Sequence, residues 1–242
     1  MYCPMKFASP LLKGILTQRY KRFLAGVVLE DGRTVTATCP NTGSMLGLTS
    51  PGSTVWLSEN DSPTRKYRHT WEMIEAGPSK ATLVGINTGH PNAIVSEAIA
   101  AGKLAELTGY AGLRREVKYG ENSRIDILLE DAKKGSCYVE IKNVHLIRKA
   151  GLAEFPDSKT ERGVKHLVEL GNMVAAGHRA VMVFLIQRGD AKLFDVAGDI
   201  DPAYLAAFNK AAARGVEMLA YRCKLSEREI KLEKRVEFRP RP

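Results

Sequence analysis

Apolar and polar positions alternate in short runs over the first 80 residues, and turn residues separate the runs. The runs "KRFLAGVVLE" and "RTVTATCP" flank Asp31-Gly32, and "STVWLS" follows Pro51-Gly52. An Asp-Gly pair between β-branched runs indicates a hairpin, and short strands at this spacing are typical of a small barrel or sandwich. The pattern predicts an all-β unit, either a small barrel or a sandwich, over residues 1–80.

The period changes near residue 92. The run "NAIVSEAIAAGKLAEL" has apolar residues at helical spacing, with Asn92 placed to cap a helix. Further helices are expected between Thr160 and Gly177 and from Pro202 to Gly215. Between and after them, strands are predicted for "LRREVKY", "SRIDILLED", "SCYVEIKNV", "AVMVFLIQ" and "VEMLAYRC". Residues 81–242 are therefore expected to form an α/β domain with the order α-β-β-β-α-β-α-β.

Composition narrows the class of protein. A chain of 242 residues with 44% hydrophobic content can bury a substantial core. No run of about 18 apolar residues occurs, and prolines and lysines interrupt the N-terminus, so we expect a soluble cytoplasmic protein without membrane contact. The four cysteines, including Cys3, lack the spacing of a zinc or disulfide framework. Lys plus Arg number 36 against 27 Asp plus Glu, and this net charge of +9 favours a polyanionic partner.

Charged residues interrupt the apolar pattern of the segment "SRIDILLEDAKKGSCYVEIKNV". Side chains alternate along a strand, so Glu140 and Lys142 share one face of the second strand. A register that keeps the apolar faces together brings Asp126 opposite or diagonal to Glu140. Like charges at such positions are destabilising unless a positive group lies between them. Two carboxylates and an ammonium group are thus predicted to share one face of the hairpin.

Oxygen ligands of this kind suit Mg²⁺ or Mn²⁺, and phosphodiester hydrolysis uses the combination of a metal, two carboxylates and a lysine. A solvated hairpin face with an ordinary Glu–Lys pair is the alternative. The α-β-β-β-α-β order with acidic residues on the second and third strands resembles the core of the PD-(D/E)xK nuclease superfamily. The pattern differs in one position, because Ile125 rather than Pro precedes Asp126.

Two helices contribute further candidates. Glu97 lies at the edge of the apolar stripe of the first helix, where it could reach the metal, or it could be an ordinary exposed residue. In the second helix, Arg162, Lys165, His166 and Glu169 follow i, i+3, i+4, i+7 spacing and line one polar face. That face could hold a phosphate backbone, although a solvated charged face is the commoner explanation.

The whole chain resembles the sugar fermentation stimulation protein A family. The resemblance is carried by stretches distributed over nearly the full length: "RFLAGVVLEDG", "CPNTGSM", "VSEAI", "SRIDILL", "YVEIKNV", "FPDSKTERGVKHLVEL" and "DPAYLAAF". It implies an N-terminal OB-like β-barrel and a C-terminal PD-(D/E)xK nuclease-like domain. It also implies DNA binding without sequence specificity and a link to the regulation of sugar, particularly maltose, metabolism.

The resemblance also implies roles for individual residues. Asp126 and Glu140 match the metal carboxylates, Lys142 the catalytic lysine and Glu97 the helical acidic residue. Ile141 completes the predicted set of metal ligands. In the barrel, Arg19, Lys21 and Arg22 beside Tyr20 and Phe23 would combine phosphate contacts with stacking surfaces. The alternative for that stretch is a basic strand edge that discourages aggregation.

Two functions follow as hypotheses. The first is a Mg²⁺- or Mn²⁺-dependent nuclease that binds DNA through the barrel and cleaves it with Asp126, Glu140 and Lys142. The second is a non-catalytic DNA-binding transcriptional regulator that uses the nuclease-like domain as a scaffold, although the sequence contains none of the usual sequence-reading modules. RNA remains an alternative substrate. The sequence does not specify the oligomeric state, and a dimer is compatible with it.

Overall fold

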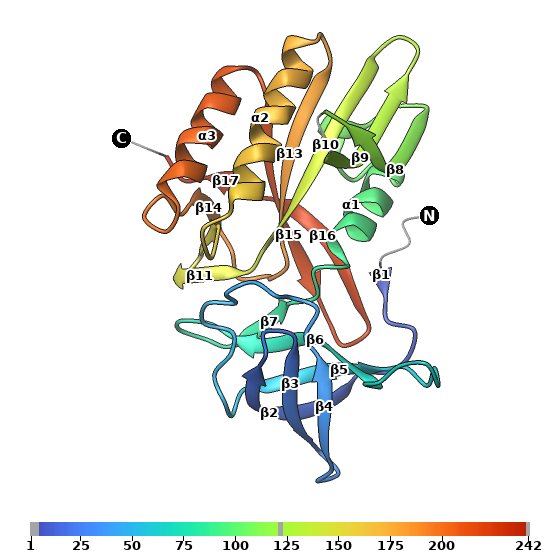
Figure 1. Ribbon diagram of the computed structural model, residues 1–242, viewed down its shortest axis with the longest axis vertical. Coiled ribbons are helices and arrows are strands. Elements are labelled where there is room, and N and C mark those ends of the chain that lie inside the picture. Colours follow the sequence, from blue (N-terminus) through green and yellow to red (C-terminus); the bar gives the residue numbers. More distant parts are fainter. Residues whose placement is uncertain (1–4, 121–122, 241–242) are drawn as a thin grey trace.

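The N-terminal strands form a closed barrel in the computed structural model, which describes residues 5–120 and 123–240 (Figure 1). Its sheet has the order β4-β3-β2-β5-β6-β7, and a parallel pairing of β4 with β6 closes it. The turn between β3 and β4 contains Gly32 at φ +85°, a conformation that favours glycine. The prediction of an all-β, OB-like unit is confirmed. The strands are β2 (Leu12–Tyr20), β3 (Leu24–Leu29), β4 (Thr34–Thr38), β5 (Thr54–Glu59), β6 (His69–Ala76) and β7 (Thr82–Gly85).

The C-terminal part is built on a mixed sheet with the order β1-β16-β15-β13-β10-β9-β8. β10 runs parallel to β13, and β13 runs parallel to β15, whereas the two edges of the sheet are antiparallel. The apolar run of β13 is buried along nearly its whole length, as expected for a central parallel strand. The strands are β1 (Met5–Lys6), β8 (Gly112–Tyr119), β9 (Ser123–Asp131), β10 (Gly135–Val144), β13 (Arg179–Ile186), β15 (Glu217–Leu225) and β16 (Glu229–Arg235).

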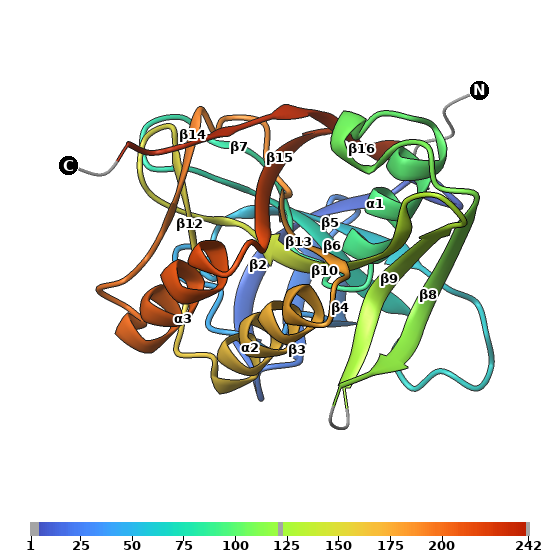
Figure 2. The same ribbon diagram turned by 90° about the horizontal axis from the view of Figure 1, so that it is seen from above.

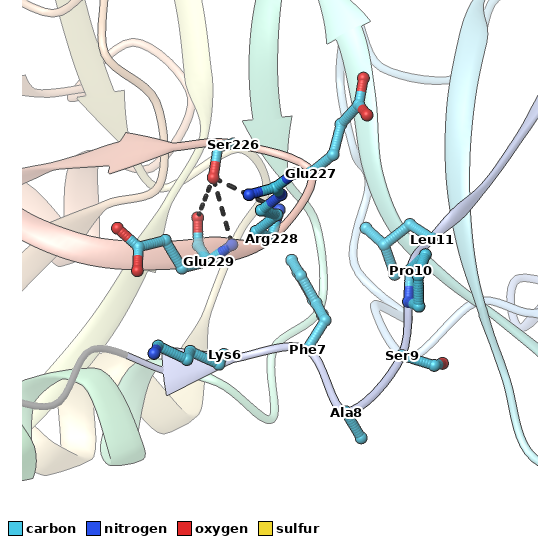
Figure 3. Close-up of a pocket in the computed structure, with 10 residues that line it drawn as sticks. All are labelled: Lys6, Phe7, Ala8, Ser9, Pro10, Leu11, Ser226, Glu227, Arg228 and Glu229. Carbon is cyan, nitrogen blue, oxygen red and sulfur yellow. Dashed lines mark hydrogen bonds between the residues drawn. The ribbon is translucent and has the colours of Figure 1, made fainter.

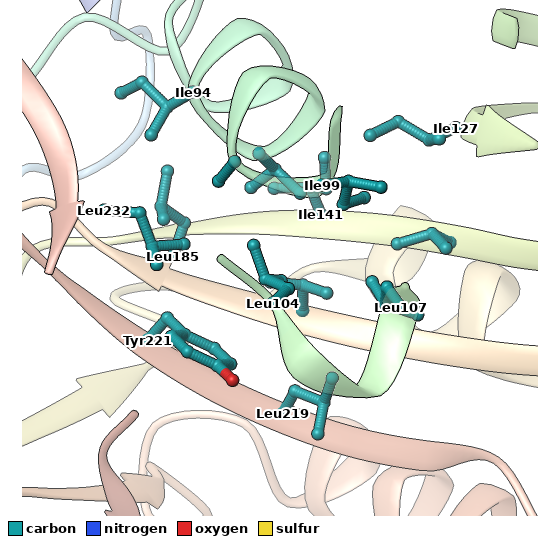
Figure 4. Close-up of a cluster of buried hydrophobic side chains, with 14 of the residues drawn as sticks. Ile94, Ile99, Leu104, Leu107, Ile127, Ile141, Leu185, Leu219, Tyr221 and Leu232 are labelled. Carbon is teal, nitrogen blue, oxygen red and sulfur yellow. The ribbon is translucent and has the colours of Figure 1, made fainter. Parts of the chain in front are cut away.

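Helices cover both faces of this sheet (Figure 2). On one face, α1 (Pro91–Ala100) and the 3-10 helix η1 (Ala105–Leu107) pack with Ile127, Val139 and Leu185, and Figure 4 shows this cluster. On the other face, α2 (Glu161–Ala175) and α3 (Pro202–Ala213) pack on a second buried cluster. The predicted α/β domain is confirmed, and its α-β-β-β-α-β-α-β order is found among the long elements, with the charged residues on β9 and β10. The strand β16, which follows β15, was not predicted.

A small third sheet was not predicted from the sequence. It has the order β11-β12-β14-β17; three of its short strands lie between longer elements of the C-terminal part, and β17 follows β16. Four strands of two to four residues give too little periodicity to be recognised in a sequence. They are β11 (Leu146–Lys149), β12 (Leu152–Phe155), β14 (Leu193–Val196) and β17 (Glu237–Phe238).

The helix termini follow the predicted chemistry, with one correction. Thr160 accepts a hydrogen bond from Gly163 N and caps α2 as expected, and Asp201 caps α3 in the same way. The prediction that Asn92 caps α1 is wrong, because His90 is the N-cap residue and Pro91 occupies the first helical position. The fixed φ of proline suits that first position, so Asn92 falls inside the helix and its side chain is free for another contact.

The chain passes between the barrel and the large sheet more than once. β1, which lies before residue 80, pairs with β16 of the large sheet, and β7, which lies after residue 80, belongs to the barrel sheet. The proposed domain boundary at residue 80 stays a prediction.

Cys39, Cys137 and Cys223 are free and buried, and Cys3 lies outside the described residues. In residues 5–120 and 123–240, no helix has the length and apolar character required to span a bilayer.

Arg188 joins the two parts at a buried position. Its side chain is 2% exposed and forms an ion pair with Asp190, at 2.7 Å from Nε to Oδ1. It also donates to the carbonyl oxygens of His145, after β10, and Ala76, at the end of β6. One guanidinium group thus satisfies acceptors from the barrel and from the large sheet.

Replacing Arg188 with Met is expected to lower the free energy of unfolding by about 3 kcal/mol, because the partners of a buried charge lose their hydrogen bonds. Urea unfolding followed by circular dichroism measures this change. The control is Arg33→Ala, which removes an exposed arginine paired with Asp31 and should leave the midpoint unchanged. An Arg188→Met protein as stable as wild type would show that the buried network contributes nothing to stability.

Candidate functional site

The pairing of β9 with β10 stops where the charged residues begin. The register runs from Asp131 opposite Gly135 to Ile127 opposite Val139. Beyond that point the Asp126 Oδ2 atom accepts a hydrogen bond from Ile141 N at 2.7 Å, in the place where another interstrand bond would form. The side chain of Asp126 therefore lies between the two strands, next to Glu140.

Glu140 is buried in the centre of this arrangement, at 2% exposure. Its Oε1 atom accepts from Lys142 Nζ at 2.7 Å and contacts His166 Nδ1 from helix α2. The Lys142 Nζ atom also lies 3.2 Å from His166 Nδ1. The second carboxylate oxygen of Glu140, Oε2, is buried and has no hydrogen-bond partner in the part of the chain that the structure describes.

The two carboxylates have opposite pKa shifts. Burial and the nearby charge of Glu140 raise the pKa of Asp126 from 3.8 to about 6, against the hydrogen bonds from Ile141 and Asn92. Burial also acts to raise the pKa of Glu140, but the hydrogen bond from His166 and the charge of Lys142 outweigh it, and the pKa is lowered. Glu140 is thus compensated by basic groups, whereas Asp126 is paired in no salt bridge among the described residues.

Tyr119 at the end of β8 lies in the same negative region. Burial, followed by the charges of Glu140, Glu169 and Asp126, raises the pKa of its hydroxyl group. That hydroxyl is buried close to Glu169. Glu169 of α2 accepts a hydrogen bond from Ser123 Oγ at 2.8 Å, which ties the helix to the start of β9.

Asn92 is a site residue that the sequence interpretation missed. Its Nδ2 atom donates to Asp126 Oδ1 at 2.9 Å and so holds the carboxylate from the side of helix α1. The sequence contained a usable signal, because a proline at position 91 predicts that the next residue is inside the helix. What the sequence could not show was that this turn of the helix faces β9.

The structure gives weaker support to the other two predicted metal ligands, Glu97 and Ile141, than to Asp126 and Glu140. Glu97 is half-buried, and burial raises its pKa against the charge of Arg115; one of its carboxylate oxygens is buried without a partner. No hydrogen bond or ion pair joins Glu97 to Asp126 or Glu140 in residues 5–120 and 123–240. The side chain of Ile141 is buried in the core, and its N–H is bonded to Asp126, so only its carbonyl oxygen can serve as a ligand.

The donor set fits a hard divalent cation. Within the described residues, no three His, Cys, Asp or Glu side chains form a preformed cage. Mg²⁺ usually binds one or two carboxylates and completes its shell with water and substrate phosphate, so a closed cage is not required. The unpartnered Oε2 of Glu140 and the uncompensated carboxylate of Asp126 are the groups that such an ion would satisfy.

The predicted nucleic-acid contacts on α2 divide into buried and exposed groups. His166 is 4% exposed and belongs to the centre itself, where it contacts Glu140 and Lys142. Arg162 is exposed, and Lys165 is exposed with its Nζ atom 3.7 Å from Glu169 Oε1. Only the first turns of α2 therefore offer positive charge to a partner.

The basic stretch of the barrel lies in the turn between β2 and β3. Lys21 and Arg22 are exposed and have positive φ values of 50° and 63°, and Phe23 is 49% exposed. Arg19 instead donates to the carbonyl oxygens of Arg22, Asn41 and Gly43, so it supports the loop around residues 41–43. The turn presents two cations and an aromatic ring to the solvent.

A groove of about 870 Å³ lies elsewhere, between residues 6–11 and the turn from β15 to β16 (Figure 3). Ser226 in that turn accepts from the backbone N–H groups of Arg228 and Glu229, as Figure 3 shows. These polar groups satisfy one another within the turn. The groove has no residue in common with the centre around Glu140.

Comparisons with known proteins agree with the fold and show the family. Residues 89–229 match the family described as "Sugar fermentation stimulation protein RE domain", and residues 17–86 match the "SfsA N-terminal OB domain". The "Sugar fermentation stimulation protein homolog" of Sinorhizobium medicae is 60% identical over 226 residues, which cover 93% of each chain. The homolog of Brucella anthropi is 58% identical and covers 93% of this chain and 96% of its own.

Solved structures include a relative from an archaeon. The structure of Pyrococcus furiosus SfsA in complex with Ca²⁺ superimposes with a TM-score of 0.85 at 26% identity and covers 98% of this chain and 100% of that one. A repair endonuclease from Pyrococcus abyssi reaches a TM-score of only 0.33 at 11% identity, over 86% and 87% of the two chains. That second likeness is too weak to add to the topological argument.

The raised pKa of Asp126 predicts how stability depends on pH in the presence of EDTA. The folded protein holds this proton up to about pH 6, so the neutral carboxyl favours folding below the ordinary value of 3.8, and this contribution is lost as the pH rises through about 6. Asp126→Asn keeps the site neutral. Its stability relative to wild type should increase between about pH 4 and pH 7, by up to about 3 kcal/mol, as expected for a two-unit difference in pKa.

Chemical denaturation at several pH values measures this difference. If the advantage of Asp126→Asn were constant over this range, Asp126 would not have a raised pKa in the folded protein.

Proposed function

The chain belongs to the sugar fermentation stimulation protein family, and from this premise we propose that it binds DNA without sequence specificity and cleaves its phosphodiester bonds with the help of a divalent cation. The observation that carries the proposal is the set of buried Glu140 and half-buried Asp126 and Lys142 on adjoining strands of a nuclease-like core. Holding two carboxylates side by side away from most of the solvent, one of them without an ion-pair partner, is costly for a protein that binds no cation there.

Asp126 and Glu140 would hold the cation, through the carboxylate of the first and the unpartnered Oε2 of the second. When bound, Mg²⁺ or Mn²⁺ polarises the phosphate and lowers the pKa of a bound water. The Pyrococcus furiosus relative was solved with Ca²⁺, an ion with the same preference for oxygen ligands, and this supports a divalent cation in the present chain.

Lys142 would stabilise the charge that develops on the phosphate. Its ammonium group is fixed by Glu140 Oε1 and lies against His166, so it needs little reorganisation during the reaction. Because it follows Glu140 by two residues on one strand, it lies on the same face as the carboxylate. His166 acts on both groups from helix α2.

The barrel would bind the nucleic acid. Lys21 and Arg22 can contact phosphates, and the exposed ring of Phe23 can stack on a base. Residues 1–80 would then bind the nucleic acid, and residues 81–242 would cleave it. DNA is the proposed substrate, RNA the alternative, and a cytoplasmic location and a link to sugar metabolism belong to the same proposal.

The second candidate is a DNA-binding regulator without catalysis. The net charge of +9 and the exposed basic turn support binding in either case. The complete set of Asp126, Glu140 and Lys142 favours the nuclease, because a scaffold would have no need for two mutually repelling carboxylates side by side, one of them buried.

Purified protein is expected to cleave supercoiled, linear or single-stranded DNA in the presence of Mg²⁺ or Mn²⁺. Asp126→Asn and Lys142→Met should each lower the rate by about 100-fold or more, because each removes a group that acts on the transition state. Gel electrophoresis measures the rate, and filter binding checks that both variants still bind DNA.

Asp131→Asn is the matched control for cleavage. Asp131 is an aspartate of the same strand, but it accepts only from the backbone of the turn at Lys133 and Lys134, so the rate should be unchanged. Cleavage of no DNA form, or equal cleavage by Asp126→Asn, contradicts the proposed nuclease.

DNA binding should depend on the barrel turn. The double variant Lys21→Ala, Arg22→Ala is expected to weaken binding and to reduce the slope of log K against log salt by about one to two, because up to two phosphate contacts are lost. Fluorescence anisotropy with duplexes of unrelated sequence measures both quantities.

The charge-matched control replaces Lys13 and Arg33 with Ala. Both residues are exposed and pair with neighbouring acidic groups, Glu30 and Asp31, so the salt slope should stay close to that of wild type. Equal losses in the two double variants would mean that net charge, not the turn, governs binding.

A further inference from the structure

Glu116 occupies an unusual position in β8. It has a φ of +54°, in the left-handed region that a glutamate rarely adopts. Its neighbours Arg115 and Val117 are paired with Ile127 and Ile125 of β9, whereas Glu116 itself lies opposite Asp126 and outside the ladder. Such strain in the backbone persists only where the surrounding structure maintains it, and it commonly occurs at functional sites.

Asn92 connects Glu116 with Asp126. The Asn92 Nδ2 atom lies 2.9 Å from Glu116 Oε1 and 2.9 Å from Asp126 Oδ1. An amide nitrogen carries two hydrogen atoms, so it can donate one to each carboxylate. The two carboxylate oxygens are therefore at most twice that distance apart, on neighbouring strands, with helix α1 above them.

Positive charge reaches this group only in part. The charge of Lys142 acts on Asp126, but its ammonium group is paired with Glu140, and in residues 5–120 and 123–240 neither Asp126 nor Glu116 takes part in a salt bridge. The adjacent Glu140 is 2% exposed, and its Oε2 atom is buried without a hydrogen-bond partner among these residues. The neutral amide of Asn92 orients two carboxylates but does not neutralise them, and one of the two, Asp126, lies next to the unpartnered oxygen of Glu140.

We propose that Glu116 is a third carboxylate of the cation centre and that Asn92 is the residue that positions it together with Asp126. The ligand is a hard divalent cation, which Glu116 approaches from the solvent-exposed side of β8. This inference rests on the proposed function, since it adds a ligand to the same centre. Neither residue is part of the Asp126, Glu140 and Lys142 set recognised from the sequence.

The left-handed backbone of Glu116 separates this role from a purely structural tie between α1 and β8. Glycine adopts positive φ without strain, so Glu116→Gly should be at least as stable in EDTA as Glu116→Gln. Both variants should nevertheless lose affinity for the cation. A structural tie would instead require the carboxylate for stability and would leave the cation affinity unaffected.

The test is a calorimetric titration of the full chain with Mn²⁺ alone, without DNA. Glu116→Gln, Glu116→Gly and Asn92→Ala are expected to weaken binding by about 10- to 100-fold, as found for ligands and for residues that orient them. The control is Glu130→Gln, an exposed carboxylate on β9 that pairs with Arg114, and it should change the affinity by less than about twofold.

Thermal unfolding with and without Mn²⁺ gives a second measurement. A cation that binds only the folded chain raises the melting temperature, and this increase should shrink in the three variants but not in Glu130→Gln. Melting in EDTA confirms in the same experiment that each variant is folded.

The outcomes distinguish the two proposals. If Asp126→Asn loses Mn²⁺ binding while Glu116→Gln and Asn92→Ala bind as wild type does, the third carboxylate is wrong and the proposed nuclease centre stands. If the wild-type chain binds no Mn²⁺, the centre itself is wrong and this inference falls with it.

Discussion

The hydrogen bond from Ile141 N to Asp126 Oδ2 is the interaction on which the centre depends. It replaces an interstrand backbone bond with a bond to a side chain, so β9 and β10 remain joined although their ladder has ended. A carboxylate that accepts a backbone N–H is fixed in direction without being neutralised. The charge of Asp126 is therefore held beside Glu140, and the strands cannot part further without leaving the N–H group of Ile141 unsatisfied.

The surrounding elements compensate this charge unevenly. On one side of the sheet, α2 brings His166 to Glu140 and Lys142, and these basic groups lower the pKa of Glu140 despite its burial. On the other side, α1 brings only the neutral amide of Asn92 to Asp126, whose pKa is raised. One half of the centre is a closed ion-pair network, and the other half retains negative charge that a cation would satisfy.

Hydrogen bonds join the barrel to the C-terminal part just before helix α2, the helix that carries His166. Asp157, which lies just before α2, accepts from Met45 N at 2.8 Å and from His145 Nε2 at 3.1 Å. Met45 lies in the same loop as Asn41 and Gly43, whose carbonyl groups accept hydrogen bonds from Arg19, next to the exposed basic turn. Packed contacts thus connect the surface proposed to bind nucleic acid with the start of the helix that carries His166.

The sequence alone determined the two-part architecture, the helix cap at Thr160 and the common face of Glu140 and Lys142, because alternation, capping and short turns act between residues that are near in the chain. The hairpin turn also brought Asp126 near Glu140. Only the tertiary structure decided that Asn92 holds both Asp126 and Glu116 and that His166 meets Glu140, because these contacts depend on which helix face packs against which strand and on the positive φ of Glu116, which a glutamate rarely adopts. Periodicity assigns a residue to a face, but packing decides what that face touches.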